Sequence, residues 1–215
     1  MRTLLSTAAV LAVVAAAGAA QAEDFTPKHA GMWVIDARAT GVIPDESGDI
    51  VTAGGVDTGL DVAIGDSWVP TLGVTWFATD HVAVDVTLGT SHHDISAAGP
   101  GPDVKVHDTW VIPPVVTLQY HFQPEARFSP YVGAGVNAMI FYGGDDRNGF
   151  TVDLDNGVGA ALQVGADYAL HGPWTLNLDV KKVWFDTDAS INGGVLRSDV
   201  SIDPWVVSLG FGRRF

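Results

Sequence analysis

One stretch of this 215-residue sequence gathers side chains that could hold a metal ion. His92, His93 and Asp94 are consecutive, and His107 follows beyond a segment rich in Gly and Pro. Metal sites need ligands whose spacing fixes a defined geometry, tetrahedral in the case of zinc. Adjacent histidines in a segment expected to be a flexible loop supply no such geometry, so we predict no metal site and no cofactor.

Ser208 and His121 are the residues that could carry hydrolytic chemistry, as nucleophile and general base. Covalent catalysis of this kind needs a third group that orients the base. No motif in the sequence places such a group beside them, and the chain has no cysteine that could act as a thiolate. We therefore predict that the protein is not an enzyme.

A larger set of polar residues recurs at alternate positions of otherwise apolar segments, where they would all face one side of a β-strand. Charged groups that are enclosed together are tolerated only if they pair. We therefore predict a polar network that holds the interior of the fold shut, at least in its lower part. Its members are Asp36, Arg38, Asp85, Gln119, His121, Gln163, Asp167, Asp179 and Lys181.

Alternation of apolar and polar residues at period two predicts the strands that position these groups. The last strand reads WVVSLGFGRRF and ends on an aromatic residue, Phe215. A strand of this kind is typical of a barrel in a bacterial outer membrane, where the last strand closes against the first. Eight strands are predicted, at residues 31–42, 69–78, 82–90, 109–122, 130–142, 157–168, 174–185 and 205–215.

The predicted connections alternate between long and short, which is the rhythm of outer-membrane barrels with short periplasmic turns and longer outer loops. The fold class is therefore all-β, an eight-stranded antiparallel up-and-down transmembrane β-barrel. Long loops outside the cell are expected at residues 44–67, 91–108, 143–156 and 186–203.

The beginning of the chain and its charge agree with this location. Residues 1–22 combine a positive head, an apolar run and a small-residue cleavage site, so they are predicted to be a signal peptide. Residues 23–215 then form the barrel. The net charge of −14 argues against binding to nucleic acid, whose phosphates need a basic surface.

Aromatic residues fall at both ends of the predicted strands, as two interfacial girdles would. A soluble lipocalin-like barrel is the alternative, with its apolar face inside. The signal peptide, the girdles and the terminal Phe215 favour the membrane. The two girdles are predicted from Trp33, Trp76, Tyr120, Phe122, Tyr131, Tyr168, Trp174 and Phe215 at one end, and Trp68, Trp110, Phe141, Tyr142, Trp184 and Trp205 at the other.

Four segments in order, IPPVVTLQYHF, SPYVGAGVN, GVGAALQVGADY and IDPWVVSLGFGRRF, resemble the outer membrane protein W (OmpW) family, which includes alkane-uptake porins. The HHDI segment at His92–Ile95 is also similar. One departure is Arg213, where the family more often has an aromatic residue. The resemblance implies an eight-stranded barrel with a narrow, partly hydrophobic lumen. It also implies passive movement of small hydrophobic molecules that leave sideways through the wall.

The upper part of the lumen is predicted to differ from the polar lower part. Met139 and Phe141 face inward near the outer end of one strand, and Val183 and Phe185 are in phase with them on another. Apolar side chains in a lumen are unusual unless they meet each other or an apolar ligand. Pro113-Pro114 cannot donate ladder hydrogen bonds, so it marks either a structural bulge or an opening in the wall.

Two functions stay open from the sequence. The first is passive passage of small hydrophobic molecules; the second is a structural or interaction barrel with a closed, ion-paired lumen. The expected partners are outer-membrane lipid, lipopolysaccharide and hydrophobic solutes. The outer-membrane assembly machinery is also expected to bind, through the terminal strand that ends in Phe215.

Overall fold

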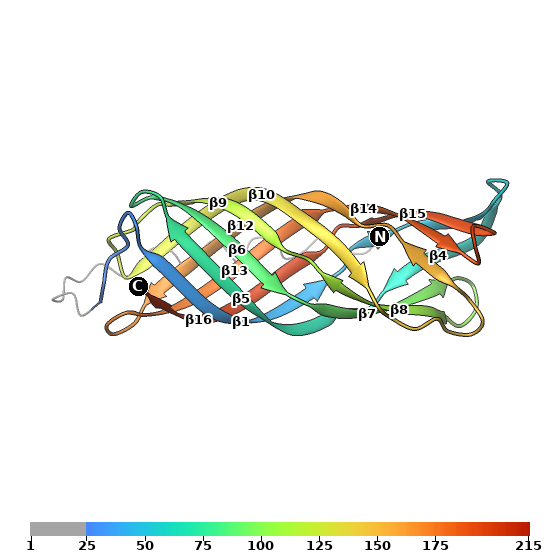
Figure 1. The fold of residues 1–215 in the computed structure, drawn as a ribbon, viewed down its shortest axis with the longest axis horizontal. Helices are drawn as coiled ribbons and strands as arrows, with labels where there is room; N and C mark the ends of the chain where they lie inside the picture. Colours follow the sequence, from blue (N-terminus) through green and yellow to red (C-terminus); the bar gives the residue numbers. More distant parts are fainter. Residues whose placement is uncertain (1–24) are drawn as a thin grey trace, which may run out of the picture.

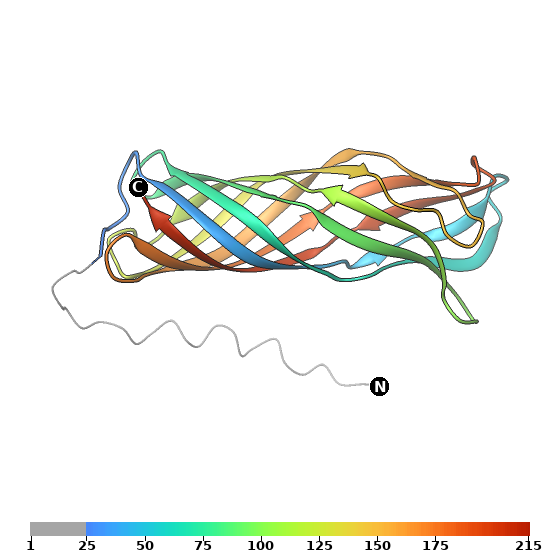
Figure 2. The ribbon, with the colours of Figure 1, turned by 60° about the horizontal axis from the view of Figure 1, so that its bottom comes forward.

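The computed structural model describes residues 25–215, and the predicted signal peptide lies outside them. Within these residues no helix is both long and apolar enough to cross a membrane. The chain forms one elongated antiparallel β-barrel (Figures 1 and 2). Its membrane part consists of β1 (Trp33–Ile43), β5 (Ser67–Phe77), β6 (Val82–Gly89), β9 (Val115–His121), β10 (Phe128–Tyr142), β12 (Gly157–Ala169), β13 (Trp174–Trp184) and β16 (Trp205–Arg214).

These eight strands close into a ring in which each pairs with the next along the chain. The terminal strand β16 pairs with β13 on one side and with β1 on the other. Phe215 and Trp33 exchange backbone hydrogen bonds of 2.8 and 3.2 Å at the end of this seam. The predicted eight-stranded antiparallel barrel is therefore confirmed.

The period-two pattern sorts side chains between the lumen and the lipid. On β9, Thr117 is 1 % exposed and the next residue, Leu118, is 59 % exposed. Most of the predicted girdle residues lie on the outer face, but two of those predictions were wrong. Tyr131 is buried in the lumen and Phe141 lines an internal cavity, because each is in phase with the inward residues of β10.

The prediction of long outer loops was wrong for residues 44–67, 91–108 and 186–203. Most of each of these segments is β-structure that extends the barrel beyond the girdle of Trp68, Trp110 and Trp184, at the right-hand end of Figure 1, whereas residues 143–156 are mainly loop, as predicted. This outer sheet consists of β2 (Glu46–Ser47), β3 (Asp49–Thr52), β4 (Asp57–Ile64), β7 (Ser91–Ala98), β8 (Val104–Ile112), β11 (Val152–Leu154), β14 (Asp186–Ile191) and β15 (Leu196–Ile202).

The loop prediction failed because Gly and Asp are typical of turns locally, whereas the hairpins of the outer sheet, such as β14–β15, pair in addition with strands that are distant in sequence. β15, for example, pairs with β3, which lies far earlier in the chain. The inner face of the outer sheet is apolar. It packs as one cluster of buried residues, Ile50, Ile95, Ala97, Val106, Val152 and Ile191.

Candidate functional site

The lower lumen, nearest the short turns, is filled by a polar network centred on Arg38. Its guanidinium donates to Asp36, to Asp85 at 2.9 Å and to Thr87 at 3.1 Å. Lys181 donates to Asp179 and lies 4.0 Å from Asp85. Both cations are buried, so these carboxylates replace the water that the charges lose.

The network continues downward from Asp179 through uncharged groups. Gln163 donates to Asp179 and accepts from Gln119, which in turn contacts His121 at 3.0 Å. His121 lies 4.0 Å from Asp167. The structure thus joins all nine residues of the predicted polar network, and each of them is buried.

Lys28, Ser129 and Tyr131 belong to the network but were not assigned to it from the sequence. Lys28 enters the base of the barrel from the segment before β1 and donates to Asp167 at 2.6 Å, to Ser129 at 2.8 Å and to His121 at 2.8 Å. Tyr131 donates its hydroxyl to Asp179 at 2.9 Å. Lys28 lies on no predicted strand, so alternation gave no signal for it, while Tyr131 could have been found from its phase with Asn137 and Met139.

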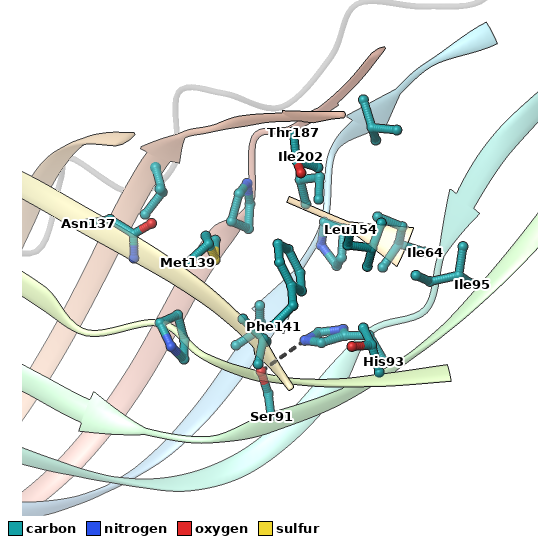
Figure 3. Close-up of a pocket in the computed structure, with 18 of the residues that line it drawn as sticks. Ile64, Ser91, His93, Ile95, Asn137, Met139, Phe141, Leu154, Thr187 and Ile202 are labelled. Carbon is teal, nitrogen blue, oxygen red and sulfur yellow. Dashed lines mark hydrogen bonds between the residues drawn. The ribbon is translucent and has the colours of Figure 1, made fainter. Parts of the chain in front are cut away.

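Above this network lies an apolar cavity, in which about 90 Å³ is open to the centre of a water-sized molecule. Met139 and Phe141 line it (Figure 3), and so does Val183, among apolar residues of both sheets. Phe185 packs in the same apolar cluster, with its ring centroid 6.2 Å from that of Phe141. The structure therefore brings the four apolar residues of the predicted upper lumen together.

Pro113 also lines the cavity, and with Pro114 it separates β8 from β9. Thr87 pairs with Val115 below this break, and Ser91 pairs with Val111 above it. The two pairs are separated by four residues on each side of the ladder. No residue is inserted, and the predicted alternative of a bulge in this ladder is wrong.

The break arises instead from missing donors. Ala138 donates to the carbonyl oxygen of Pro114 at 3.0 Å. A regular antiparallel pair would return a second hydrogen bond from residue 114 to Ala138. Proline has no N–H, so that bond is absent and the wall is weakened here without any change of register.

A second proline break was not predicted. Pro44 and Pro204 both line the cavity and lie between the paired residues Ile43–Trp205 and Ser47–Ser201. Lys182 spans this break. Its ammonium donates to Asp45 at 3.1 Å and to the carbonyl oxygen of Asp203. Among the described residues, no ionic contact of this kind crosses the Pro113-Pro114 break.

The residues that could do chemistry have separate partners. His92 contacts Asp108 at 3.2 Å and His107 contacts Asp146 at 2.9 Å. His93 donates Nδ1–H to the carbonyl oxygen of Gly65 at 2.8 Å and accepts from Ser91 at 3.0 Å. Burial lowers the pKa of His93, which keeps this ring neutral.

Ser208 and His121, the pair considered for hydrolysis, contact different groups. The Ser208 hydroxyl lies 2.9 Å from that of Thr40, and His121 contacts Lys28 and Gln119. The ring of His121 also packs 4.8 Å from that of Phe77 between centroids. These contacts assign both residues to the filling of the lumen.

On the outer surface, Arg147 anchors the connection between β10 and β11 to β8. Its guanidinium donates to Asp108 at 2.6 and 2.9 Å and lowers the pKa of that carboxyl to about 2. Because the pKa of Asp108 is lowered on folding, its stabilising contribution is present above the ordinary carboxyl pKa and is lost as pH falls toward 2.

We expect Arg147→Leu to raise the pKa of Asp108 toward the ordinary value of ~3.9. A contact that remains in this variant, from the backbone N–H of Asp145 to Asp108 at 3.1 Å, should then weaken at a higher pH than in the wild type, because the carboxylate protonates sooner. NMR titration of the Asp108 carboxyl measures this directly. Arg197→Leu, an exposed arginine on β15, is the matched control, and an equal shift in that variant would contradict the assignment.

Comparison with known proteins places this geometry among outer-membrane barrels. A model of the OmpW family matches residues 29–215. The chain is 40 % identical to the outer-membrane protein y4mB of Sinorhizobium fredii, over 100 % of this chain and 97 % of that protein. It is 31 % identical to the outer membrane protein AlkL of Ectopseudomonas oleovorans, over 92 % and 90 % of the two chains.

The fold agrees with a solved member of this group. The crystal structure of the outer membrane protein OprG from Pseudomonas aeruginosa superposes with a TM-score of 0.83 at 31 % identity. The match covers 88 % of this chain and 98 % of OprG. These findings fix the location of the barrel as the outer membrane.

Proposed function

The chain belongs to the OmpW family of outer-membrane proteins, and on that premise we propose that it gives small hydrophobic molecules a passive, non-enzymatic route into the outer membrane. The observation that carries the proposal is the apolar cavity directly above a filled polar lumen. A hydrophobic solute has apolar surface to rest against in the upper barrel. Beneath it, paired charges occupy the lumen and block descent to the periplasm.

The exit that follows is sideways, through the wall beside Pro113-Pro114. One missing ladder donor already weakens the wall there. The Pro44–Pro204 break is a poorer candidate because Lys182 spans it by hydrogen bonds to both strands. A molecule that leaves beside Pro114 passes from Met139 to the apolar outer surface at Ile112 and Ile140, and so enters the lipid.

The partners in this proposal are the hydrophobic solutes themselves, the surrounding outer-membrane lipid and lipopolysaccharide. The exposed terminal Phe215 supports the expected contact of the last strand with the assembly machinery. The alternative function, a structural or interaction barrel, is favoured by one observation, the complete filling of the lower lumen.

Repair of the break tests the proposed exit. Pro113→Thr with Pro114→Val restores both backbone donors, so the wall should close and entry of n-octane into cells should fall to the rate of a strain without the protein. Pro204→Val is the matched control and should leave entry unchanged. The folded state of each variant is checked by its heat-dependent mobility in gels.

The two outcomes that contradict the proposal are distinct. Wild-type rates in the repaired double variant would place the exit elsewhere. Equal rates in the wild-type and deletion strains would remove the passage function altogether and leave the structural barrel.

A further inference from the structure

Asn137 lies where the cavity meets the polar network. It faces inward from β10, two residues before Met139, and is 2 % exposed. It lines the cavity, and Figure 3 shows it at one end, next to Met139. Its side chain is therefore a polar group presented to an otherwise apolar space.

The orientation of the Asn137 amide is fixed by its neighbour. The amide nitrogen, Nδ2, donates to the carbonyl oxygen of Pro114 at 3.3 Å. A carbonyl oxygen only accepts, so the nitrogen must face Pro114 and the amide oxygen, Oδ1, must face away from it. The same side chain that holds the wall at Pro114 thus offers an acceptor elsewhere.

That acceptor has no donor among the described residues. Four buried side-chain atoms of residues 25–215 have no hydrogen-bond partner: the side-chain oxygens of Asn137, Asn177 and Ser198, and the Nε–H donor of Arg214. Of these, only Asn137 lines the cavity. A buried acceptor without a donor costs free energy, so a molecule that donates a hydrogen bond there is stabilised.

Other polar groups on the cavity wall are already engaged. Thr87 donates to Asp85, Thr187 donates to the carbonyl oxygen of Asp155, and His93 uses both ring nitrogens. Among the amide and imidazole acceptors of the cavity wall, only Asn137 Oδ1 therefore lacks a hydrogen-bond donor. An acceptor discriminates between a ligand that carries a donor and one that carries only acceptors.

We propose that Asn137 Oδ1 is a binding subsite for the hydroxyl group of a single-headed amphipathic solute, a medium-chain primary alcohol. The hydroxyl donates to Oδ1, and the alkyl chain lies along Met139 and Val183. This inference rests on the proposed passage function and adds the substrate class. It also places the head group beside the Pro114 carbonyl, next to the proposed exit.

The test compares three ligands of equal chain length on the folded wild-type protein in phosphatidylcholine nanodiscs. 1-Octanol carries a donor, 2-octanone carries only an acceptor, and n-octane carries neither. Affinities are read from the Met139 methyl resonance and divided by the partition of each ligand into empty nanodiscs. We expect 1-octanol to bind about fivefold more tightly than 2-octanone, as one added hydrogen bond predicts.

Asn137→Leu should abolish this preference, and Thr187→Val, at another polar position of the wall, should retain it. If Asn137→Leu does not fold, the ligand comparison on the wild type decides alone. Equal affinity for 1-octanol and 2-octanone overturns the subsite and leaves the passage proposal standing. No shift of the Met139 resonance with any ligand overturns both.

Discussion

Cells that carry Met139→Asp should take up n-octane no faster than cells without the protein. Met139 is buried and lines the cavity beside the proposed exit, so the carboxyl group replaces apolar surface in a confined space. An n-octane molecule in the cavity would remove water from this carboxyl group and offer it no hydrogen bond. Burial of a polar group without a partner costs roughly 1–3 kcal/mol. Each 1.4 kcal/mol corresponds to about tenfold in occupancy.

Two companion variants separate blockage from misfolding. Met139→Leu conserves volume and should keep uptake within about twofold of the wild type, because such exchanges are well tolerated in cores. Met139→Trp should block uptake by bulk without adding charge. Wild-type uptake in a folded Met139→Asp variant would show that solutes do not pass this point.

Lys181→Met should destabilise the barrel by about 3–5 kcal/mol, the usual cost of removing one partner from a buried ion pair. Lys181 is fully buried, and its ammonium lies between Asp179 and Asp85. Its loss leaves the negative charge of Asp179 without a cation. Urea unfolding in lipid vesicles measures the change in the free energy of unfolding.

The adjacent residue is the matched control. Lys182 points to the outside and pairs with the exposed Asp45, so Lys182→Met should cost only about 1 kcal/mol or less. Equal losses in the two variants would contradict the assignment of Lys181 to a buried network. Lys181 also lines the cavity, but methionine keeps that part of the wall apolar, so uptake of n-octane by folded Lys181→Met should stay near the wild-type rate.

Alternation along the chain was sufficient to predict the membrane strands, because lipid and lumen impose opposite polarity on neighbouring residues. Thr117 and Leu118 on β9 illustrate this rule. It could not predict the outer sheet, where β4 and β15 contain several Gly, Asp and Ser residues and are stabilised by partners distant in sequence. Local composition contains no information on such pairing.

The candidate site was predictable to a similar degree. Met139 and Phe141 were assigned to the upper lumen from their phase on one strand, and Asp179 and Lys181 to the polar network in the same way. Lys28 was not predictable, since the segment before β1 has no periodicity that would place it inside the barrel. The Pro44–Pro204 break was missed because its two prolines lie at opposite ends of the chain and meet only on closure.

The central claim is that the upper lumen holds an apolar molecule on its way to the lipid. Crystals grown with 1-bromooctane test this most directly, since bromine gives an anomalous-scattering peak that distinguishes the ligand from detergent and water. The account predicts a bromine peak inside the cavity, between Met139 and the Pro113-Pro114 break. Bromine peaks confined to the lipid-facing surface, with the cavity free of them, would contradict it.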